Sequence, residues 1–300
     1  MTPLRRLGPC ATTGVGSLPF ADPVAAVAHV RAAYDVPFCP QLPALDGDMV
    51  AEWVTADPGR CGFSEERQRP HPAAWDAFVA SLAATPPIHG LAKLQVTGPV
   101  TLAFGLGRTP GSPDLTGLAR DLARWAGATL QAWVAELAEL GLTAIVVVDE
   151  PGLACAAGAP LADVWDAIRA VAPVFGMHVC GAVPWSLLCA VQPDLVSFDA
   201  CRAEHRGHGM SDAVRALRRR GIRAVPGVID VAAPTPDALP GDALGDLLPA
   251  LITPACGTGL CTPDQERTIA ARLRRFAADA RAAARRGEGG RGYPEAAGGG

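Results

Sequence analysis

The stretch Ala144–Val148 has the sequence AIVVV and is followed directly by Asp149 and Glu150. All five residues are apolar and all but the first are β-branched, which is typical of a strand buried on both faces of a parallel sheet. A long, alanine-rich amphipathic segment, Leu115–Leu140, precedes this strand and ends at Gly141, a common stop signal for a helix. A helix leading into a buried strand is the repeating unit of an α/β fold.

The same alternation extends along the chain in both directions. Seven further apolar runs predict strands, at Thr12–Gly16, Val36–Cys39, Ile88–Val96, Val174–Val179, Asp194–Phe198, Arg223–Val228 and Ala250–Ile252. Predicted helices lie at Val24–Tyr34, Ala73–Ala84, Leu161–Val171, Pro184–Val191 and Ser211–Arg220, and from the capping residue Thr262 to about Arg286. Eight such units predict a single (β/α)₈ TIM barrel over residues 1–285, with an insertion after the first strands and a disordered Gly-rich tail at 286–300.

An open, doubly wound α/β sheet is the alternative fold. It requires a glycine-rich phosphate-binding loop between its first strand and the following helix. The segment Gly14–Ser17 lacks the third glycine of that loop, and the Leu18-Pro19 continuation does not start a helix. The sequence therefore favours the barrel.

Composition excludes several classes of protein. The 300 residues are 49% hydrophobic and 19% charged, with a net charge of −4 and a pI near 5.9, so there is no electrostatic reason to expect a nucleic-acid partner. No run of eighteen apolar residues predicts a membrane span, and residues 1–9 lack the apolar core of a secretory signal. We expect a cytoplasmic protein. Its nine cysteines, an odd number without paired spacing, indicate metal binding, reactivity or core packing rather than a disulfide scaffold.

In a TIM barrel the catalytic groups gather at the C-terminal ends of the strands. His178 and Cys180, Asp199 and Cys256 each stand at the end of a predicted strand. Imidazole and thiolate are ligands that zinc prefers, and three protein ligands with one open position are the pattern of catalytic zinc. Other polar residues end predicted strands in the same way: Ser17, Thr97, Asp149, Glu150 and Asp230.

Several short motifs recur in the order found in one known family. They are the segments 13–19 (TGVGSLP), 48–50 (DMV), 96–101 (VTGPVT), 148–151 (VDEP), 178–180 (HVC), 226–230 (PGVID) and 254–257 (PACG). On these motifs the chain, from Thr12 to about Ala280, resembles the C-terminal catalytic domain of cobalamin-independent methionine synthase. That domain belongs to a wider superfamily that includes uroporphyrinogen decarboxylase.

The resemblance implies a zinc cofactor and its ligands. In that family a zinc ion held by a histidine, two cysteines and a glutamate binds the thiol of homocysteine. By resemblance, His178, Cys180 and Cys256 are ligands, and Asp199, a shorter carboxylate, falls at the position of the glutamate. A strand-end carboxylate without a metal remains the alternative for Asp199. Zinc deprotonates a bound thiol, and the resulting thiolate then attacks a methyl group.

The resemblance also implies substrate-binding residues. Asp149 matches the position that receives the amino group of the substrate, and the loop containing Val15 and Ser17 matches the part that receives its carboxylate. Glu150 follows Asp149 and is assigned to the same substrate site, with a salt bridge in a loop as the alternative for this pair of acids. Asp149 and Asp230 are the candidate catalytic residues.

Departures from the family leave the methyl donor open. The family's second, N-terminal barrel is absent, no histidine follows Asp230, and no tryptophan follows Thr101. The expected partners are a small thiol and a methyl donor, either methyl-tetrahydrofolate or a methyl-corrinoid that a carrier protein can hold. The sequence thus predicts a zinc-dependent S-methyltransferase. A metal-free lyase resembling uroporphyrinogen decarboxylase and a non-catalytic barrel that binds zinc or a thiol are the alternatives.

Overall fold

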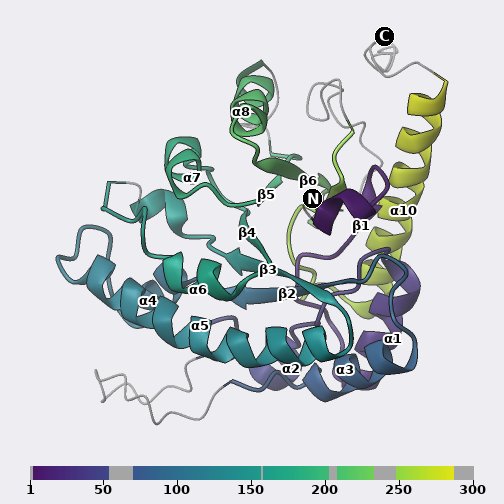
Figure 1. Cartoon of the computed structure of the whole chain (residues 1–300), viewed down its shortest axis with the longest axis horizontal. Coiled ribbons are helices and arrows are strands. Elements are labelled where there is room, and N and C mark those ends of the chain that lie inside the picture. Colours follow the sequence, from purple (N-terminus) through teal and green to yellow (C-terminus); the bar gives the residue numbers. More distant parts are fainter. Residues whose placement is uncertain (1–2, 54–69, 157, 203–207, 233–247, 287–300) are drawn as a thin grey trace.

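The computed structural model describes residues 3–53, 70–156, 158–202, 208–232 and 248–286. Within them a seven-stranded parallel sheet has the order β1-β7-β6-β5-β4-β3-β2 (Figure 1). Its strands are β1 (Ala11–Thr12), β2 (Leu91–Thr97), β3 (Thr143–Asp149), β4 (Val174–Val179), β5 (Leu195–Asp199), β6 (Arg223–Ile229) and β7 (Leu251–Pro254). The α/β class and the parallel sheet are confirmed.

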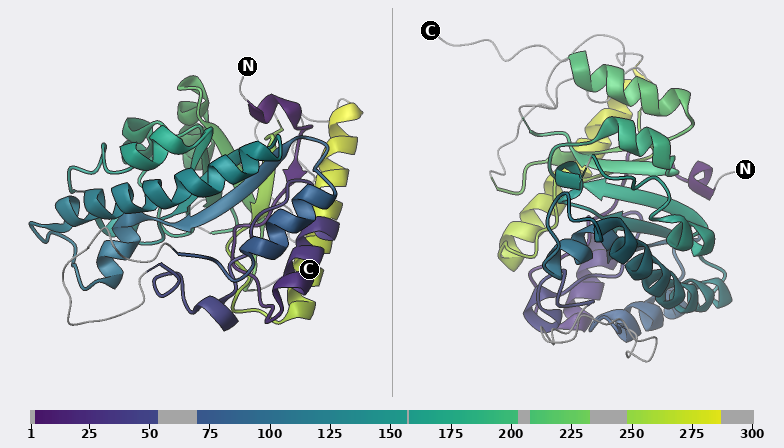
Figure 2. Two further views of the ribbon diagram at one scale, coloured as in Figure 1. Left: turned by 60° about the horizontal axis from the view of Figure 1, so that its bottom comes forward. Right: turned by 90° about the vertical axis from the view of Figure 1, so that its left-hand side faces the viewer.

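Helices cover the outer face of the curled sheet (Figure 2). The helical segments of the described residues are η1 (Pro3–Arg6), α1 (Pro23–Ala33), α2 (Pro43–Asp46), α3 (Trp75–Ala84), α4 (Pro99–Gly105), α5 (Leu115–Glu139), η2 (Leu153–Ala156), α6 (Asp166–Val171), α7 (Trp185–Val191), α8 (His208–Arg219) and α10 (Pro263–Arg285). The predicted capping box of α10 is present: the Thr262 hydroxyl accepts from the Gln265 backbone N–H, and the Gln265 side chain accepts from the Thr262 backbone N–H. The predicted helix Leu161–Val171 is wrong in length, since only its second half is α-helical.

The prediction of eight strands requires a correction at Val36–Cys39. This segment lies between the two edges of the sheet: the Val36 N–H donates to Thr12 of β1, and the Cys39 N–H donates to Lys93 of β2. It makes only an isolated bridge at Phe38 rather than a regular strand, because Pro37 has no N–H to donate. The described sheet is therefore a curled, TIM-like sheet of seven strands, not a closed barrel of eight.

The inward face of the sheet changes from apolar to polar along the strands. On β3, Ile145, Val147 and Asp149 share this face, since side chains of a strand alternate between its two sides. Leu195 and Ser197 repeat the change on β5. Ile145, Val147 and Leu195 belong to a buried apolar cluster inside the sheet. A separate apolar cluster fills the space between the sheet and the helices. The polar end of the interior is thus the C-terminal end of the strands.

Two predictions fall partly outside the described residues. The insertion after the first strands continues into residues 54–69, and the predicted tail continues past residue 286. Among the described helices none is both long enough and apolar enough to cross a membrane.

Candidate metal centre

Three predicted ligands come together at the polar end of the interior. His178 is near the end of β4, Cys180 follows that strand, and Cys256 follows β7. One ligand atom from each lies within 4.8 Å of the others. In the sheet, β5 and β6 separate β4 from β7, so only the curl of the sheet brings these side chains together. A group of one imidazole and two thiols matches the ligand preference of zinc.

The imidazole of His178 is oriented as a metal ligand requires. Its Nδ1 lies 2.9 Å from the Oγ of Ser197, the residue paired with it on β5. Its Nε2 is buried and has no hydrogen-bond partner, and the residue as a whole is 1% exposed. A buried nitrogen without a partner is costly unless something binds it. Histidine ligands of metals commonly donate their other N–H to a neighbouring group, which fixes the ring. The geometry therefore fits a metal ion at Nε2.

Each of the two thiols changes the pKa of the other. The pKa of Cys256 is lowered to about 4, first because Cys180 donates a hydrogen bond to its sulfur and further because His178 lies beside it. The pKa of Cys180 is raised far above its usual range by that same hydrogen bond and by burial. Without a metal the pair thus holds one proton and one negative charge. A metal ion bound there would favour the thiolate form of both cysteines, so the shared proton would be released.

The structure does not bring the fourth predicted ligand into this group. Among the described residues the cluster comprises His178, Cys180 and Cys256 without Asp199. One carboxylate oxygen of Asp199, Oδ1, accepts the backbone N–H of Cys201 at 2.8 Å. That contact ties the short aspartate side chain to the loop after β5. A zinc ion held by these three side chains would keep one further position for another ligand.

Asp149 lies next to the three-ligand group. It pairs with His178 in the register of β3 and β4. Its Oδ1 is buried without a hydrogen-bond partner, and burial raises its pKa while His178 opposes that shift. A buried acceptor without a donor is a place where a ligand N–H can bind.

Lys93 is a site residue that the sequence analysis missed. Its Nζ is buried and donates to the backbone oxygen of Val15 at 2.5 Å and to Oε1 of Gln95 at 2.6 Å. Burial lowers its pKa to about 7, and the nearby Asp149 opposes that shift. The available signal was a charged side chain in the middle of a predicted strand. Lys93 holds the carbonyl of Val15, one of the predicted substrate-binding residues.

Ser17, also predicted to bind substrate, joins the loop after β1 to the loop carrying Cys256. Its backbone oxygen accepts the N–H of Thr258 at 2.9 Å, and its Oγ accepts the N–H of Gly259 at 3.3 Å. A Cβ on Gly257 would lie 2.1 Å from Ser17 Oγ, so only glycine fits there. The position of the cysteine ligand and the position of Ser17 therefore depend on each other.

We expect Gly257→Ala to destabilise the protein by about 1–3 kcal/mol, because the added methyl group overlaps Ser17 Oγ. Urea unfolding measures the effect. In the double variant Ser17→Ala with Gly257→Ala the overlapping oxygen is gone, and most of the loss is recovered. Purely additive losses in that double-mutant cycle would contradict the contact.

Glu150 is placed differently from the substrate-binding role predicted for it. Its carboxylate is fully buried, and each oxygen accepts two hydrogen bonds. The donors are the backbone N–H groups of Val100 and Thr101, the Thr101 hydroxyl and the indole of Trp165. Glu150 therefore satisfies the first turn of α4 instead of facing a substrate. Its pKa is raised to about 7 by burial, and these hydrogen bonds oppose that shift.

Asp230, the other predicted catalytic residue, follows β6 and is half-buried. Its Oδ1 accepts the backbone N–H of Ala232 at 2.8 Å. This contact forms a turn at the end of the strand. Its catalytic role stays a prediction.

Glu52 is a second titratable group, after Lys93, that the sequence analysis missed. The side-chain amide of Gln41 donates to its Oε2 at 2.7 Å. Burial of the carboxyl raises its pKa to about 8, and the charge of Asp46 adds to the shift. The folded state thus binds this proton more tightly than the unfolded chain does.

We expect stability to fall as the pH rises from about 4.5 to 8, because the unfolded chain releases the proton of Glu52 first. The contribution is about 1–3 kcal/mol after allowance for the partial exposure of this residue. Urea unfolding between pH 5 and pH 9 measures it. Glu52→Gln makes the pH dependence shallower and leaves the part that comes from the buried Glu150, whereas the exposed control Glu139→Gln keeps the full slope. The same pH dependence in both variants would rule out Glu52 as its source.

Comparison with solved structures finds a methyltransferase from Methanosarcina mazei with a TM-score of 0.59, covering 92% of this chain and 97% of that chain. The sequence identity is 15%, so the likeness is one of fold. No known family model matches the chain, and no curated protein sequence does either. The curled α/β sheet with its His-Cys-Cys cluster is thus built on a fold that a methyltransferase also uses.

Proposed function

We propose that the protein is a zinc-dependent S-methyltransferase that activates a small thiol and methylates it, with homocysteine as the expected thiol. The observation that carries this proposal is the convergence of His178, Cys180 and Cys256 within 4.8 Å. The fold shared with the Methanosarcina mazei methyltransferase supports the reaction class. The motif resemblance to cobalamin-independent methionine synthase supports the thiol substrate.

The residues present fit a catalytic zinc site. Nε2 of His178 and the sulfurs of Cys180 and Cys256 would hold the ion, leaving one tetrahedral position for the substrate. Zinc bound there would lower the pKa of a thiol and make it a nucleophile near neutral pH. Ser197 orients the imidazole, as neighbours of ligating histidines commonly do.

The other polar groups suit the remainder of an amino-acid thiol. Oδ1 of Asp149 is buried and without a donor, so it can accept an ammonium N–H of the substrate. The buried Lys93 lies near Asp149 and favours its charged form. Lys93 also fixes the carbonyl of Val15 and with it the loop that is proposed to receive the carboxylate. The chain would thus position the thiol beside the ion through contacts at the opposite end of the substrate.

Zinc analysis combined with a methyl-transfer assay tests this proposal. We expect one tightly bound zinc per chain and methylation of homocysteine. Protein that carries no zinc, and takes up none after reduction, would contradict the metal site. Zinc-loaded protein that methylates no thiol with methylcobalamin or methyl-tetrahydrofolate would contradict the methyltransferase activity. The alternative of a non-catalytic barrel that binds zinc would then be favoured.

We expect methylcobalamin to support faster turnover than methyl-tetrahydrofolate. The folate leaves as an amine and needs a proton, and general acid catalysis typically contributes about 10²–10⁴-fold. The residues after Asp230 are Val231 and Ala232, which carry no acid, and the carboxylate of Asp230 accepts a backbone N–H. A reduced corrinoid leaves without a proton. Steady-state rates with the two donors at matched concentration test this preference, and metal-depleted protein is the control. Faster turnover with methyl-tetrahydrofolate would refute the predicted preference for methylcobalamin.

A further inference from the structure

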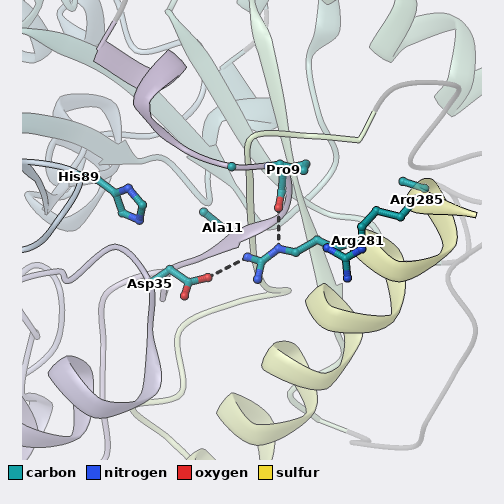
Figure 3. Close-up of a pocket in the computed structure, with 8 residues that line it drawn as sticks. Pro9, Ala11, Asp35, His89, Arg281 and Arg285 are labelled. Carbon is teal, nitrogen blue, oxygen red and sulfur yellow. Dashed lines mark hydrogen bonds and ion pairs between the residues drawn. The ribbon is translucent and has the colours of Figure 1, made fainter.

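A cavity lies at the opposite end of the sheet from the candidate metal centre. It has a volume of about 540 Å³ and lies between the N-terminal ends of β1 and β2 and the last turns of α10 (Figure 3). In Figure 3, His89 lies on the far side of the cavity from Arg285, with Asp35 and Arg281 between them. A cavity of this size is within the range of small-molecule binding sites.

Arg281 is held rigidly at the wall of this cavity. Its Nε donates to the backbone oxygen of Pro9 at 2.8 Å, and its Nη2 donates to the backbone oxygen of Cys10 at 2.8 Å and to Asp35 at 3.0 Å. These three bonds use the N–H groups of Nε and Nη2, so both N–H groups of Nη1 stay available. The ion pair with Arg281 also neutralises the charge of Asp35.

The other ionisable side chains around the cavity, Arg285 and His89, are basic in type. Arg285 lies one helical turn after Arg281 and, within the described part of the chain, neither it nor His89 makes an ion pair. Arg6 reaches the same region: its Nη1 is 3.3 Å from the position that a Cβ would take on Gly90, next to His89. A local excess of positive charge in a protein with a net charge of −4 is opposite to the average of its surface. Such an excess attracts anions.

We propose that this cavity binds a small phosphate ester. Arginine is the preferred side chain for phosphate oxygens, and a guanidinium already fixed by three bonds loses little entropy on binding. Pro9 and Ala284 give the cavity apolar walls for an organic group, and its volume exceeds what a bare phosphate fills. The site is distinct from the proposed methyl-transfer centre and does not depend on it.

Titration calorimetry of the full chain with phenyl phosphate and with inorganic phosphate tests the site. We expect saturable binding of phenyl phosphate at one site per chain, several-fold tighter than that of inorganic phosphate. Arg285→Gln weakens the binding about tenfold, since a charge-assisted hydrogen bond is lost. Arg285 is the residue of choice because no described contact of the fold depends on it, unlike Arg281. The matched control Arg275→Gln removes the same charge from the same helix outside the cavity, and its affinity stays unchanged.

Three results would overturn the proposal. They are no binding of phenyl phosphate by the wild-type chain, equal affinity of the Arg285→Gln and Arg275→Gln variants, or inorganic phosphate binding as tightly as the ester. None of them bears on zinc content or methyl transfer, so this proposal and the proposed function fail or stand separately.

Discussion

Cys256→Ser is expected to lose the bound zinc and, with it, methyl transfer. Cys256 supplies a sulfur to the three-ligand group, and its lowered pKa marks a thiol that its surroundings already stabilise as thiolate. Removing a neighbour that only orients a ligand typically costs 10–100-fold in metal affinity, so removing the ligand itself should cost more than about 100-fold. Metal analysis after dialysis against a weak chelator measures the loss, and circular dichroism shows whether the fold is retained.

Matched variants separate the ligands from other residues of the same type. Cys180→Ser should behave like Cys256→Ser, whereas Cys155→Ser, which changes an exposed cysteine, should keep zinc. Asp199→Ala should retain more zinc than Cys180→Ala, because the structure leaves Asp199 outside the three-ligand group. Equal loss in Cys256→Ser and Cys155→Ser would mean that the wrong sulfurs have been chosen.

Glu150→Ala is expected to destabilise the fold by about 3–5 kcal/mol. The substitution leaves four donors buried without an acceptor, three of them at the first turn of α4. It also empties space against Gly98, where a Cβ would lie 2.1 Å from Glu150 Cδ. Urea unfolding at pH 8 measures the change in free energy of unfolding.

The control for this prediction is an exposed glutamate. Glu139→Ala, near the C-terminal end of α5, should change stability by about 0.5 kcal/mol or less. If Glu150→Ala is equally mild and instead raises the KM for the thiol, the predicted role of Glu150 in substrate binding is restored and the capping role is wrong.

The fold was predictable where one local signal dominated. The apolar run around Val146 and the long amphipathic helix before it are indicated by periodicity alone, and the capping residues of α10 mark its first turn. Val36–Cys39 was predicted as a strand because its residues are apolar. The missing N–H of Pro37 limits its pairing to bonds with Thr12 and Lys93, and that pattern depends on neighbours far away in the sequence.

The candidate site, like the fold, was predictable from the sequence only in part. Ligand chemistry and strand-end position were enough to select His178, Cys180 and Cys256, because the ends of parallel strands meet at one edge of the sheet. The direction in which a carboxylate points was not predictable in this way. Asp149 and Glu150 are adjacent in sequence, yet one faces the metal centre and the other faces α4. Side chains that are adjacent along an extended chain point to opposite sides, so Asp149 and Glu150 were expected to differ. The sequence alone does not say which of the two faces the interior.

X-ray absorption at the zinc edge tests the central claim most directly, since it reports the number and type of atoms bound to the ion. For the purified protein we predict two sulfur ligands at about 2.3 Å and one imidazole nitrogen at about 2.0–2.1 Å, with a light atom in the fourth position. Addition of homocysteine should raise the number of sulfur ligands to three while the imidazole stays. A zinc environment of nitrogen and oxygen only, or a sulfur count that the thiol leaves unchanged, would contradict the account.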